Sequence, residues 1–125
     1  MNVRDAMTPV VLTAPASTTI AEAASLMAQR RVGSALVVEG EQLLGIFTER
    51  DIVKALSQDS MATHQPIGHW MTRDPESISP DASLEEALQR MVGGHFRHLP
   101  VMEEGRLVGM LSMRDVSRLT VGGDT

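Results

Sequence analysis

Apolar residues recur at helical spacing in the first third of the chain, between Thr19 and Arg30. A recurrence every three or four residues is typical of an amphipathic helix that covers a core. Hydroxyl residues at positions 17–19 can cap such a helix by accepting hydrogen bonds from its free N–H groups. The pattern therefore predicts a helix over residues 19–30, with a buried face formed by Ile20, Ala23, Ala24 and Met27.

Two short apolar runs follow this helix. They span residues 35–38 and 43–47, and the polar turn Glu39-Gly40-Glu41-Gln42 separates them. Two such runs around a glycine-containing turn predict a β-hairpin. Thr48 then stands before another helical stretch, which we expect to continue through Leu56.

The second half of the chain repeats this pattern at a fixed distance. When the sequence is shifted by 64 positions, Met7-Thr8 falls on Met71-Thr72 and Arg50-Asp51 falls on Arg114-Asp115 without a gap. Chance matches would scatter over several shifts, so one shift that carries them all indicates an internal duplication. The second copy predicts a helix over 83–91, a hairpin of 99–102 and 107–111 around the turn 103–106, and a helix from Ser112 through Leu119.

Each copy is expected to fold as strand, helix, strand, strand and helix. A unit of about 55 residues buries too little surface to be secure alone. We therefore expect an α/β (α+β) fold in which two β-α-β-β-α repeats pack sheet to sheet, with pseudo-twofold symmetry, into one module. A cleft on either side of that seam would be the natural place for a ligand. The predicted boundaries are 1–58 for the first repeat, 59–66 for a linker and 67–125 for the second repeat.

Composition narrows the classes of function. The chain is 42% hydrophobic and 22% charged, as in ordinary globular proteins. It has no cysteine, which excludes disulfides, thiolate metal sites and cysteine nucleophiles. A net charge of −5 without a basic block argues against a nucleic-acid partner. The sequence has no apolar run of signal-peptide or membrane-helix length, so we expect a cytoplasmic protein with no membrane partner.

One motif that occurs in both copies carries candidate chemistry. Thr48 and Ser112 each stand at a strand-to-helix junction, three residues before Asp51 and Asp115. One interpretation is helix capping. The other is ligand binding, because a helix N-terminus suits phosphate and a carboxylate can accept both hydroxyls of a ribose. Capping explains neither the arginine before each aspartate nor the glycine three residues before each hydroxyl residue, where a side chain would obstruct a bound molecule.

These residues carry a family resemblance. The pattern Gly-hydrophobic-x-Thr/Ser-x-Arg-Asp after a hairpin, with Met-Thr at the head of each repeat, is similar to the CBS domain, and a tandem pair is called a Bateman module. The resemblance covers nearly the whole chain. It implies a regulatory module, not an enzyme, that binds AMP, ADP, ATP or S-adenosylmethionine in its central clefts. It also implies a homodimer that signals to an effector protein, which the sequence does not identify.

The resemblance further implies roles for individual residues. Asp51 and Asp115 would each hold a ribose, Thr48 and Ser112 would lie near phosphate or ribose, and the strands after each Met-Thr would line the adenine. The expected ligand-binding residues are Leu12, Thr13, Thr48, Arg50, Asp51, Ser77, Ile78, Arg97, His98, Ser112, Arg114 and Asp115.

Arg97 and His98 form a basic pair that has no counterpart in the first copy, where Gly33 and Ser34 stand instead. The pair resembles the phosphate-binding residues of nucleotide-binding family members, and it favours a nucleotide over S-adenosylmethionine because the latter needs no phosphate donors. A solvated pair at the entrance of a strand is the alternative interpretation.

Three other functions stay open. A purely structural dimerisation module would have empty or blocked clefts. An enzyme would need a nucleophile–base pair or a cofactor motif, and the sequence has neither. A metal site would need His95 and His98 on one helix with His64 or His69 as a third ligand, and no motif of known spacing supports it. No cofactor and no metal are therefore expected.

Overall fold

The computed structural model of the chain describes residues 1–9 and 12–122, and it divides into two compact units. The central unit spans Leu12–Pro75. The terminal unit joins the N-terminal residues to the chain from Glu76 onward. The predicted repeats therefore follow one another along the sequence, whereas each compact unit combines segments from both repeats.

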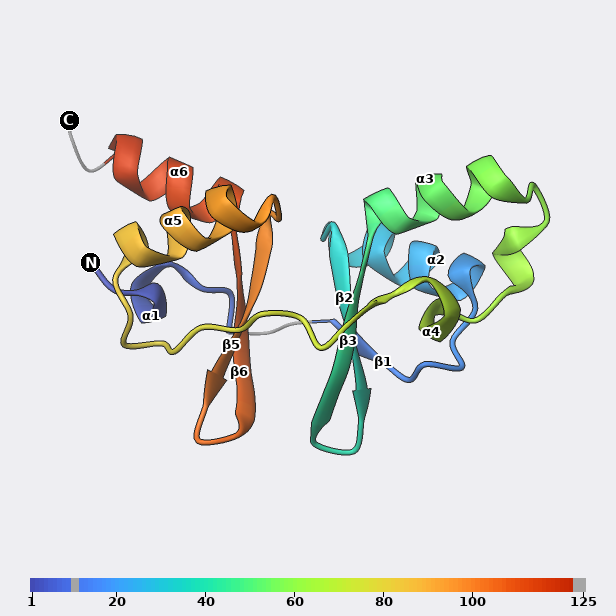
Figure 1. Cartoon of the computed structure of the whole chain (residues 1–125), viewed down its shortest axis with the longest axis horizontal. Coiled ribbons are helices and arrows are strands. Elements are labelled where there is room, and N and C mark those ends of the chain that lie inside the picture. The colour runs from blue at the N-terminus through green and yellow to red at the C-terminus, as the bar shows by residue number, and fades with distance from the viewer. Residues whose placement is uncertain (10–11, 123–125) are drawn as a thin grey trace. The chain divides into compact units, whose positions relative to one another are not determined.

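The central unit is a sheet of four strands in the order β1-β2-β3-β4, accompanied by helices (Figure 1). Strands β2 and β3 form the predicted antiparallel hairpin, and the short β1 runs parallel to β2. Its elements are β1 (Thr13–Ala14), α2 (Ile20–Arg30), β2 (Ser34–Glu39), β3 (Gln42–Thr48), α3 (Glu49–Gln58), the 3-10 helix η1 (Ala62–His64), α4 (Ile67–Trp70) and β4 (Thr72–Arg73).

The terminal unit has the same arrangement, but only its hairpin forms a regular sheet, and single bridges replace the pairings of β1 and β4. It contains the predicted hairpin of β5 and β6, with Ile78 bridged in parallel to Val101 and Thr8 bridged antiparallel to Met110. These bridges correspond, 64 residues apart, to the pairs of Ala14 with Val37 and of Thr72 with Ile46 in the central unit. Its elements are α1 (Val3–Ala6), α5 (Leu84–Gly94), β5 (His98–Glu103), β6 (Arg106–Ser112) and α6 (Met113–Gly122).

The start of α2 follows from local chemistry, as predicted. The Thr19 side chain accepts a hydrogen bond from the Glu22 backbone N–H at 3.1 Å, and the Glu22 carboxylate accepts one from the Thr19 N–H at 3.2 Å. This reciprocal capping box satisfies two N–H groups that have no partner within the helix. The bonds from the Thr19 backbone and hydroxyl hold the pKa of Glu22 below its ordinary value. The helix ends at Arg31, which adopts a left-handed conformation with φ of 56°.

Two short helices were not expected from the sequence. Val3 of α1 and Ile67 of α4 occupy matching positions 64 residues apart, and both side chains are fully buried. Val3 belongs to the core cluster of the terminal unit, and Ile67 belongs to that of the central unit. Ile67 follows the predicted linker, in which the structure places η1. The start of each repeat therefore completes the core around the hairpin of the other repeat.

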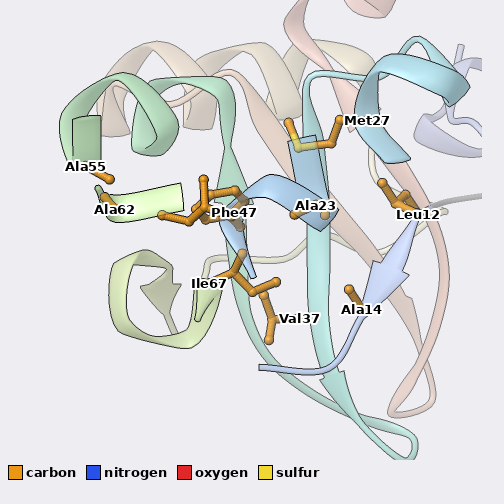
Figure 2. Packing of buried hydrophobic residues seen from close by; sticks show 11 residues of the cluster. Leu12, Ala14, Ala23, Met27, Val37, Phe47, Ala55, Ala62 and Ile67 are labelled. Carbon is orange, nitrogen blue, oxygen red and sulfur yellow. The ribbon is translucent and has the colours of Figure 1, made fainter. Parts of the chain in front are cut away.

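The core of the central unit is aliphatic except for Phe47, its largest fully buried side chain. Figure 2 shows this cluster, in which Ile67 of α4 joins Phe47 of β3 and Val37 of β2. Burying one such side chain contributes about 1.5–3 kcal/mol relative to leaving it exposed. Side chains from segments that precede and follow the β2–β3 hairpin in the sequence therefore pack against it. This packing fixes the position of the hairpin, and the candidate site lies at the end of the hairpin opposite its turn.

Candidate functional site

The predicted site residues of the central unit gather at one end of its sheet. Thr48 ends β3 and pairs with Ser34 at the start of β2. The Leu12 carbonyl accepts a hydrogen bond from the Leu36 N–H at 2.9 Å, which places the start of β1 near the same end. In Figure 1 the hairpin turn lies at the far end of these strands, away from α2 and α3. The fold therefore places residues 12, 13 and 48 at the same end of the sheet, on strands that flank β2, although 36 and 35 positions of sequence separate residues 12 and 13 from Thr48.

Thr48 and Asp51 form a complete capping box at the start of α3. The Asp51 Oδ2 accepts hydrogen bonds from the Thr48 N–H at 2.9 Å and from the Thr48 hydroxyl at 3.2 Å. The Asp51 N–H in turn donates to the Thr48 hydroxyl at 3.4 Å. The capping interpretation is confirmed, and Asp51 is only 8% exposed.

Ser112 and Asp115 repeat this arrangement in the terminal unit. The Asp115 Oδ2 accepts from the Ser112 N–H at 3.3 Å and from its hydroxyl at 2.8 Å, and the Asp115 N–H donates to that hydroxyl at 3.1 Å. The two sites differ at the second carboxylate oxygen. Arg118 Nη2 lies 3.7 Å from Asp115 Oδ1, whereas Asp51 has no ion pair within the described part of the chain.

Capping does not use up the binding capacity of Asp51. A carboxylate accepts at two oxygens, and the cap occupies only Oδ2. Oδ1 accepts no hydrogen bond from any residue in the described ranges, so it stays available to hydroxyl donors of a ligand. The capping interpretation and the ligand-binding interpretation are therefore compatible.

The basic residues of the predicted site lie beside these helix starts. Arg50 and Arg114 are exposed in the first turns of α3 and α6. The Arg97 carbonyl accepts a hydrogen bond from the Met113 N–H at 2.8 Å, which joins the strand entrance to the start of α6. His98, the first residue of β5, pairs with Ser112 at the end of β6. The structure thus places Arg97, His98, Ser112 and Asp115 at one end of the terminal unit.

Ser77 and Ile78 lie along the edge of β5 that does not pair with β6. The Ile78 N–H donates to the Pro100 carbonyl at 3.0 Å. The Ser77 carbonyl accepts from Arg90 Nη1 at 2.8 Å. Arg90 was not among the predicted site residues, although one signal was present, because the matching position in the first repeat is the apolar Leu26.

The structure gives the repeated glycines a different role from the one expected. A Cβ atom at Gly45 would lie 2.6 Å from the Thr72 carbonyl oxygen and 2.7 Å from Met71 Sδ. A Cβ atom at Gly109 would lie 2.8 Å from the Thr8 carbonyl oxygen and 2.9 Å from Met7 Sδ. The space beside each glycine is therefore filled by a Met-Thr segment and not kept clear for a bound molecule. The same contacts explain why Met-Thr and glycine recur together in both repeats.

The metal interpretation finds no support in the geometry. His95 is the left-handed residue that ends α5, and His98 begins β5, so the two do not share a helix. Within the described ranges, no three histidine or acidic side chains cluster closely enough to hold a metal ion. No helix of the described chain has the length and apolar character needed to cross a membrane.

A family comparison accounts for the duplicated unit. The model of the CBS domain family matches residues 3–58 and again residues 67–122. The chain belongs to the CBS domain family. The two matches take up nearly all of the 125 residues, and the chain is a CBS pair with a mixed α/β fold.

Two curated proteins illustrate the relatives of this CBS pair. The CBS domain-containing protein YhcV of Bacillus subtilis is 37% identical over 116 residues, which cover 93% of this chain and 83% of that protein. The CBS domain-containing protein CBSCBSPB1 of Arabidopsis thaliana is 41% identical over 104 residues, or 82% of this chain. The matched part is 19% of that longer plant protein.

Solved structures of similar proteins have the same fold. ATU1752 from Agrobacterium tumefaciens matches with a TM-score of 0.92 and 32% identity, over 96% of this chain and 99% of that chain. The CBS domain pair of MJ0100, solved with 5-methylthioadenosine and S-adenosylmethionine, matches at 0.91 and 28%, over 100% and 98%. CBSX2, solved in complex with AMP, matches at 0.81 and 25%, over 99% and 98%.

Proposed function

We propose that this CBS pair is a regulatory module that binds an adenine nucleotide, namely AMP, ADP or ATP. The observation that carries the proposal is the hydroxyl–carboxylate pair at a strand-to-helix junction, found once in each unit with the same hydrogen bonds. The proposal includes a cytoplasmic location, a homodimer, and a change in dimer conformation that passes the signal to an effector protein.

The chemistry of the central site suits a nucleoside. Asp51 Oδ1 offers an anionic acceptor for ribose hydroxyls, and the Thr48 hydroxyl can rotate to donate to a phosphate oxygen. Residues 12 and 13 would offer backbone groups to the adenine, whereas the Leu12 side chain is buried in the core of the central unit. In the terminal unit Asp115 and Ser112 would take the corresponding roles, with Ser77 at the position that matches Thr13 and Ile78 beside it.

The ligands of two relatives support an adenosine-containing ligand. MJ0100 was solved with 5-methylthioadenosine and S-adenosylmethionine, and CBSX2 was solved with AMP. All three molecules contain adenosine and differ at its 5′ position. An adenosine group held by the aspartates, with a variable group at the basic residues, would accommodate all three of these ligands.

The basic residues distinguish between the two ligand classes. S-adenosylmethionine carries a sulfonium next to the ribose and a net positive charge, and positive side chains beside that sulfonium would repel it. Arg97 and Arg114 are exposed near the start of α6, where a phosphate would be attracted. S-adenosylmethionine is the second candidate, favoured by the likeness to MJ0100.

Thermal unfolding with AMP, ADP, ATP, S-adenosylmethionine and GTP tests the proposal. A ligand at 100 times its dissociation constant stabilises the folded state by about 2.7 kcal/mol. For a domain of this size the midpoint should rise by several degrees. A shift with adenine compounds and none with GTP is expected. If protein free of copurified nucleotide shows no shift with any of them, a purely structural module becomes the better account.

Asp51→Asn and Asp115→Asn identify the site that responds. Asparagine keeps an acceptor for the cap but loses the anionic oxygen that a ribose would use. Glu22→Gln is a matched control, because it neutralises the same position of the capping box in α2, outside the candidate site. Loss of the thermal shift in an aspartate variant, with the shift retained in Glu22→Gln, is expected. An unchanged shift in both aspartate variants would contradict the proposed site.

Signal transmission needs a separate measurement. A ligand changes a conformational equilibrium only if it binds the two states with different affinity. Sedimentation velocity and hydrogen exchange with and without the bound ligand should therefore differ. Identical profiles under saturation would limit the function to binding alone.

A further inference from the structure

The two candidate sites differ in whether their free carboxylate oxygen already has a partner within the chain. Arg118 Nη2 of α6 lies 3.7 Å from Asp115 Oδ1, the oxygen that the cap leaves over. Asp51 Oδ1 has no ion pair among the described residues, although Lys54 stands three positions after it, where α6 has Arg118. No buried side-chain oxygen in the described ranges lacks a hydrogen-bond partner, so Asp51 Oδ1 keeps contact with solvent. The matching oxygens are therefore open in the central unit and paired with a cation in the terminal unit.

A second arginine bonds a backbone acceptor of the terminal site. The N–H and the carbonyl of Ile78 both bond to β5, at 3.0 Å each. Because successive carbonyls of an extended segment point to opposite sides, the Ser77 carbonyl points away from β5. Arg90 of α5 reaches it there, with Nη1 2.8 Å from the carbonyl oxygen. The outward acceptor of this segment is therefore occupied.

The central unit has no donor at the corresponding place. Thr13 stands 64 residues before Ser77, on the edge strand β1. The Leu12 carbonyl bonds to β2, so the Thr13 carbonyl points away from that strand. The residue that matches Arg90 is Leu26, an apolar side chain that packs against the core of the central unit. No side chain in the described ranges donates to the Thr13 carbonyl, which stays available to a ligand.

Adenosine needs both of these acceptors. The 6-amino group of adenine donates hydrogen bonds, and a ribose presents hydroxyl donors. A ligand in the terminal site has to displace two guanidinium groups before its own donors can bond there. Hydrogen bonds from a charged group are about twice as strong as neutral ones, so this displacement opposes binding. The central site offers the matching oxygens without a competing side chain.

We propose that the two sites are not equivalent: the central unit holds the high-affinity site, and Arg90 and Arg118 keep the terminal site autoinhibited. This inference rests on the proposed function and adds a regulation of the second site to it. The chain then binds one nucleotide tightly and a second one only at a higher concentration. A module of this kind responds over two concentration ranges of the same ligand.

Calorimetric titration with AMP measures the number of sites per chain and the affinity of each. We expect a tight site and a second site that is about tenfold weaker, as for one charge-assisted hydrogen bond that has to be displaced. Asp51→Asn should abolish the tight site, and Asp115→Asn should abolish only the weak one. Asparagine keeps an acceptor for each cap, so both variants should fold.

Arg90→Leu/Arg118→Gln tests the autoinhibition directly. Leucine is the residue that the first repeat has at the position of Arg90, and the Arg118 side chain is 72% exposed, so the double variant should fold. The affinity of the terminal site for AMP should rise about tenfold and approach that of the central site. Adenosine should show the same gain. Since adenosine has no phosphate, an altered attraction for phosphate could not explain it.

Arg106→Gln is the control for general electrostatics. Arg106 is exposed at the start of β6, beside the hairpin turn and at the opposite end of the strand from Ser112. Its removal changes the net charge of the terminal unit without freeing an acceptor of the site. Both AMP affinities should stay at their wild-type values.

The outcomes separate the inference from the proposed function. If AMP binds two sites of equal affinity in the wild type, or if Asp115→Asn removes the tighter site, the inference is overturned and the proposed function stands. The same holds if the double variant shows no gain at the terminal site, or if Arg106→Gln gives an equal gain. If no nucleotide binds to the wild type, both are overturned.

Discussion

The central and terminal units fill the same place in their cores with different pairs of side chains. In the central unit, Ala35 on β2 lies opposite Phe47 on β3, and in the terminal unit Leu99 lies opposite Leu111. All four side chains are fully buried. One pair combines a small and a large residue, and the other combines two of intermediate size. The duplicated fold thus keeps both positions apolar and fully buried, although the two pairs divide the space differently between their members.

The two units also differ at the starts of corresponding helices. Thr19 and Glu22 bond each other reciprocally at the start of α2. At the start of α5, the Ser83 side chain accepts from the Glu86 N–H at 3.0 Å, and no return bond from Ser83 to the Glu86 carboxylate completes the box. A hydroxyl residue and a glutamate three positions later therefore satisfy two backbone N–H groups at the start of α2 but only one at the start of α5.

The largest effect is expected for Phe47→Ala. The substitution removes the largest fully buried side chain of the central unit and leaves a cavity that its neighbours fill only in part. The free energy of unfolding should fall by about 3–5 kcal/mol in urea titrations. Val53→Ala, at a side chain 67% exposed, is the control and should change stability by less than about 0.5 kcal/mol. A loss below 1 kcal/mol for Phe47→Ala would show that this core is not closely packed.

The next effect tests the contacts of the repeated glycines. Gly45→Ala would place a methyl group 2.6 Å from the Thr72 carbonyl oxygen, and Gly109→Ala would place one 2.8 Å from the Thr8 carbonyl oxygen. A backbone carbonyl cannot rotate aside as a flexible side chain can. We expect losses of about 3 kcal/mol, near the upper range for overpacking. Gly93→Ala, where a methyl group would meet open space, should be neutral or stabilising. Two unaffected glycine variants would contradict the assigned role.

The sequence predicted the parts of the fold that have a strong periodic or repeated signal. The helix from Ile20, both hairpins and the internal duplication are confirmed, because their buried faces recur at fixed spacing. The short helices α1 and α4 were missed. A segment of four residues is too short for a hydrophobic period, and nothing local indicates that Val3 packs beside Leu99 and not within its own repeat.

The same limit applied to the candidate site: its local contacts were predictable from the sequence, and its contacts between distant residues were not. The hydroxyl–aspartate spacing specified the capping boxes, because a cap depends on residues three positions apart. The role of Gly45 was not predictable, since its neighbour Thr72 lies 27 positions further along the chain. The bond from Arg90 to the Ser77 carbonyl was missed for the same reason, although the loss of an apolar residue at that repeat position was visible.

An exchange of core volumes between the units should have a smaller effect. Ala35→Leu adds volume opposite Phe47 and should destabilise the fold by about 2 kcal/mol through overpacking. The double variant Ala35→Leu/Phe47→Leu reproduces the Leu99–Leu111 pair of the terminal unit. It should recover most of the loss, and a double-mutant cycle in urea would measure a stabilising coupling energy. Additive losses would mean that the pair is not interchangeable between units.

The smallest effect concerns the difference between the two helix starts and depends on pH. The pKa of Glu22 is held below its ordinary value by hydrogen bonds from the Thr19 N–H and hydroxyl. A lowered folded pKa means that Glu22 stabilises the folded state fully above its unfolded pKa of about 4.3. This contribution is lost as the pH falls through the lower folded pKa. Glu22→Gln keeps the acceptor but cannot titrate, so the decline in stability below that pH should become shallower.

Glu86→Gln is the matched control in the terminal unit. The Glu86 carboxylate accepts no hydrogen bond from Ser83, so this substitution removes a carboxylate at the same helix position without breaking a capping bond. The comparison requires urea titrations of both variants and the wild type between pH 3 and pH 7. Because Glu22 is exposed, solvent screens its interactions and the difference should be small. Equal acid dependence in Glu22→Gln and Glu86→Gln would mean that the reciprocal bond of Thr19 adds no stability over the single bond of Ser83.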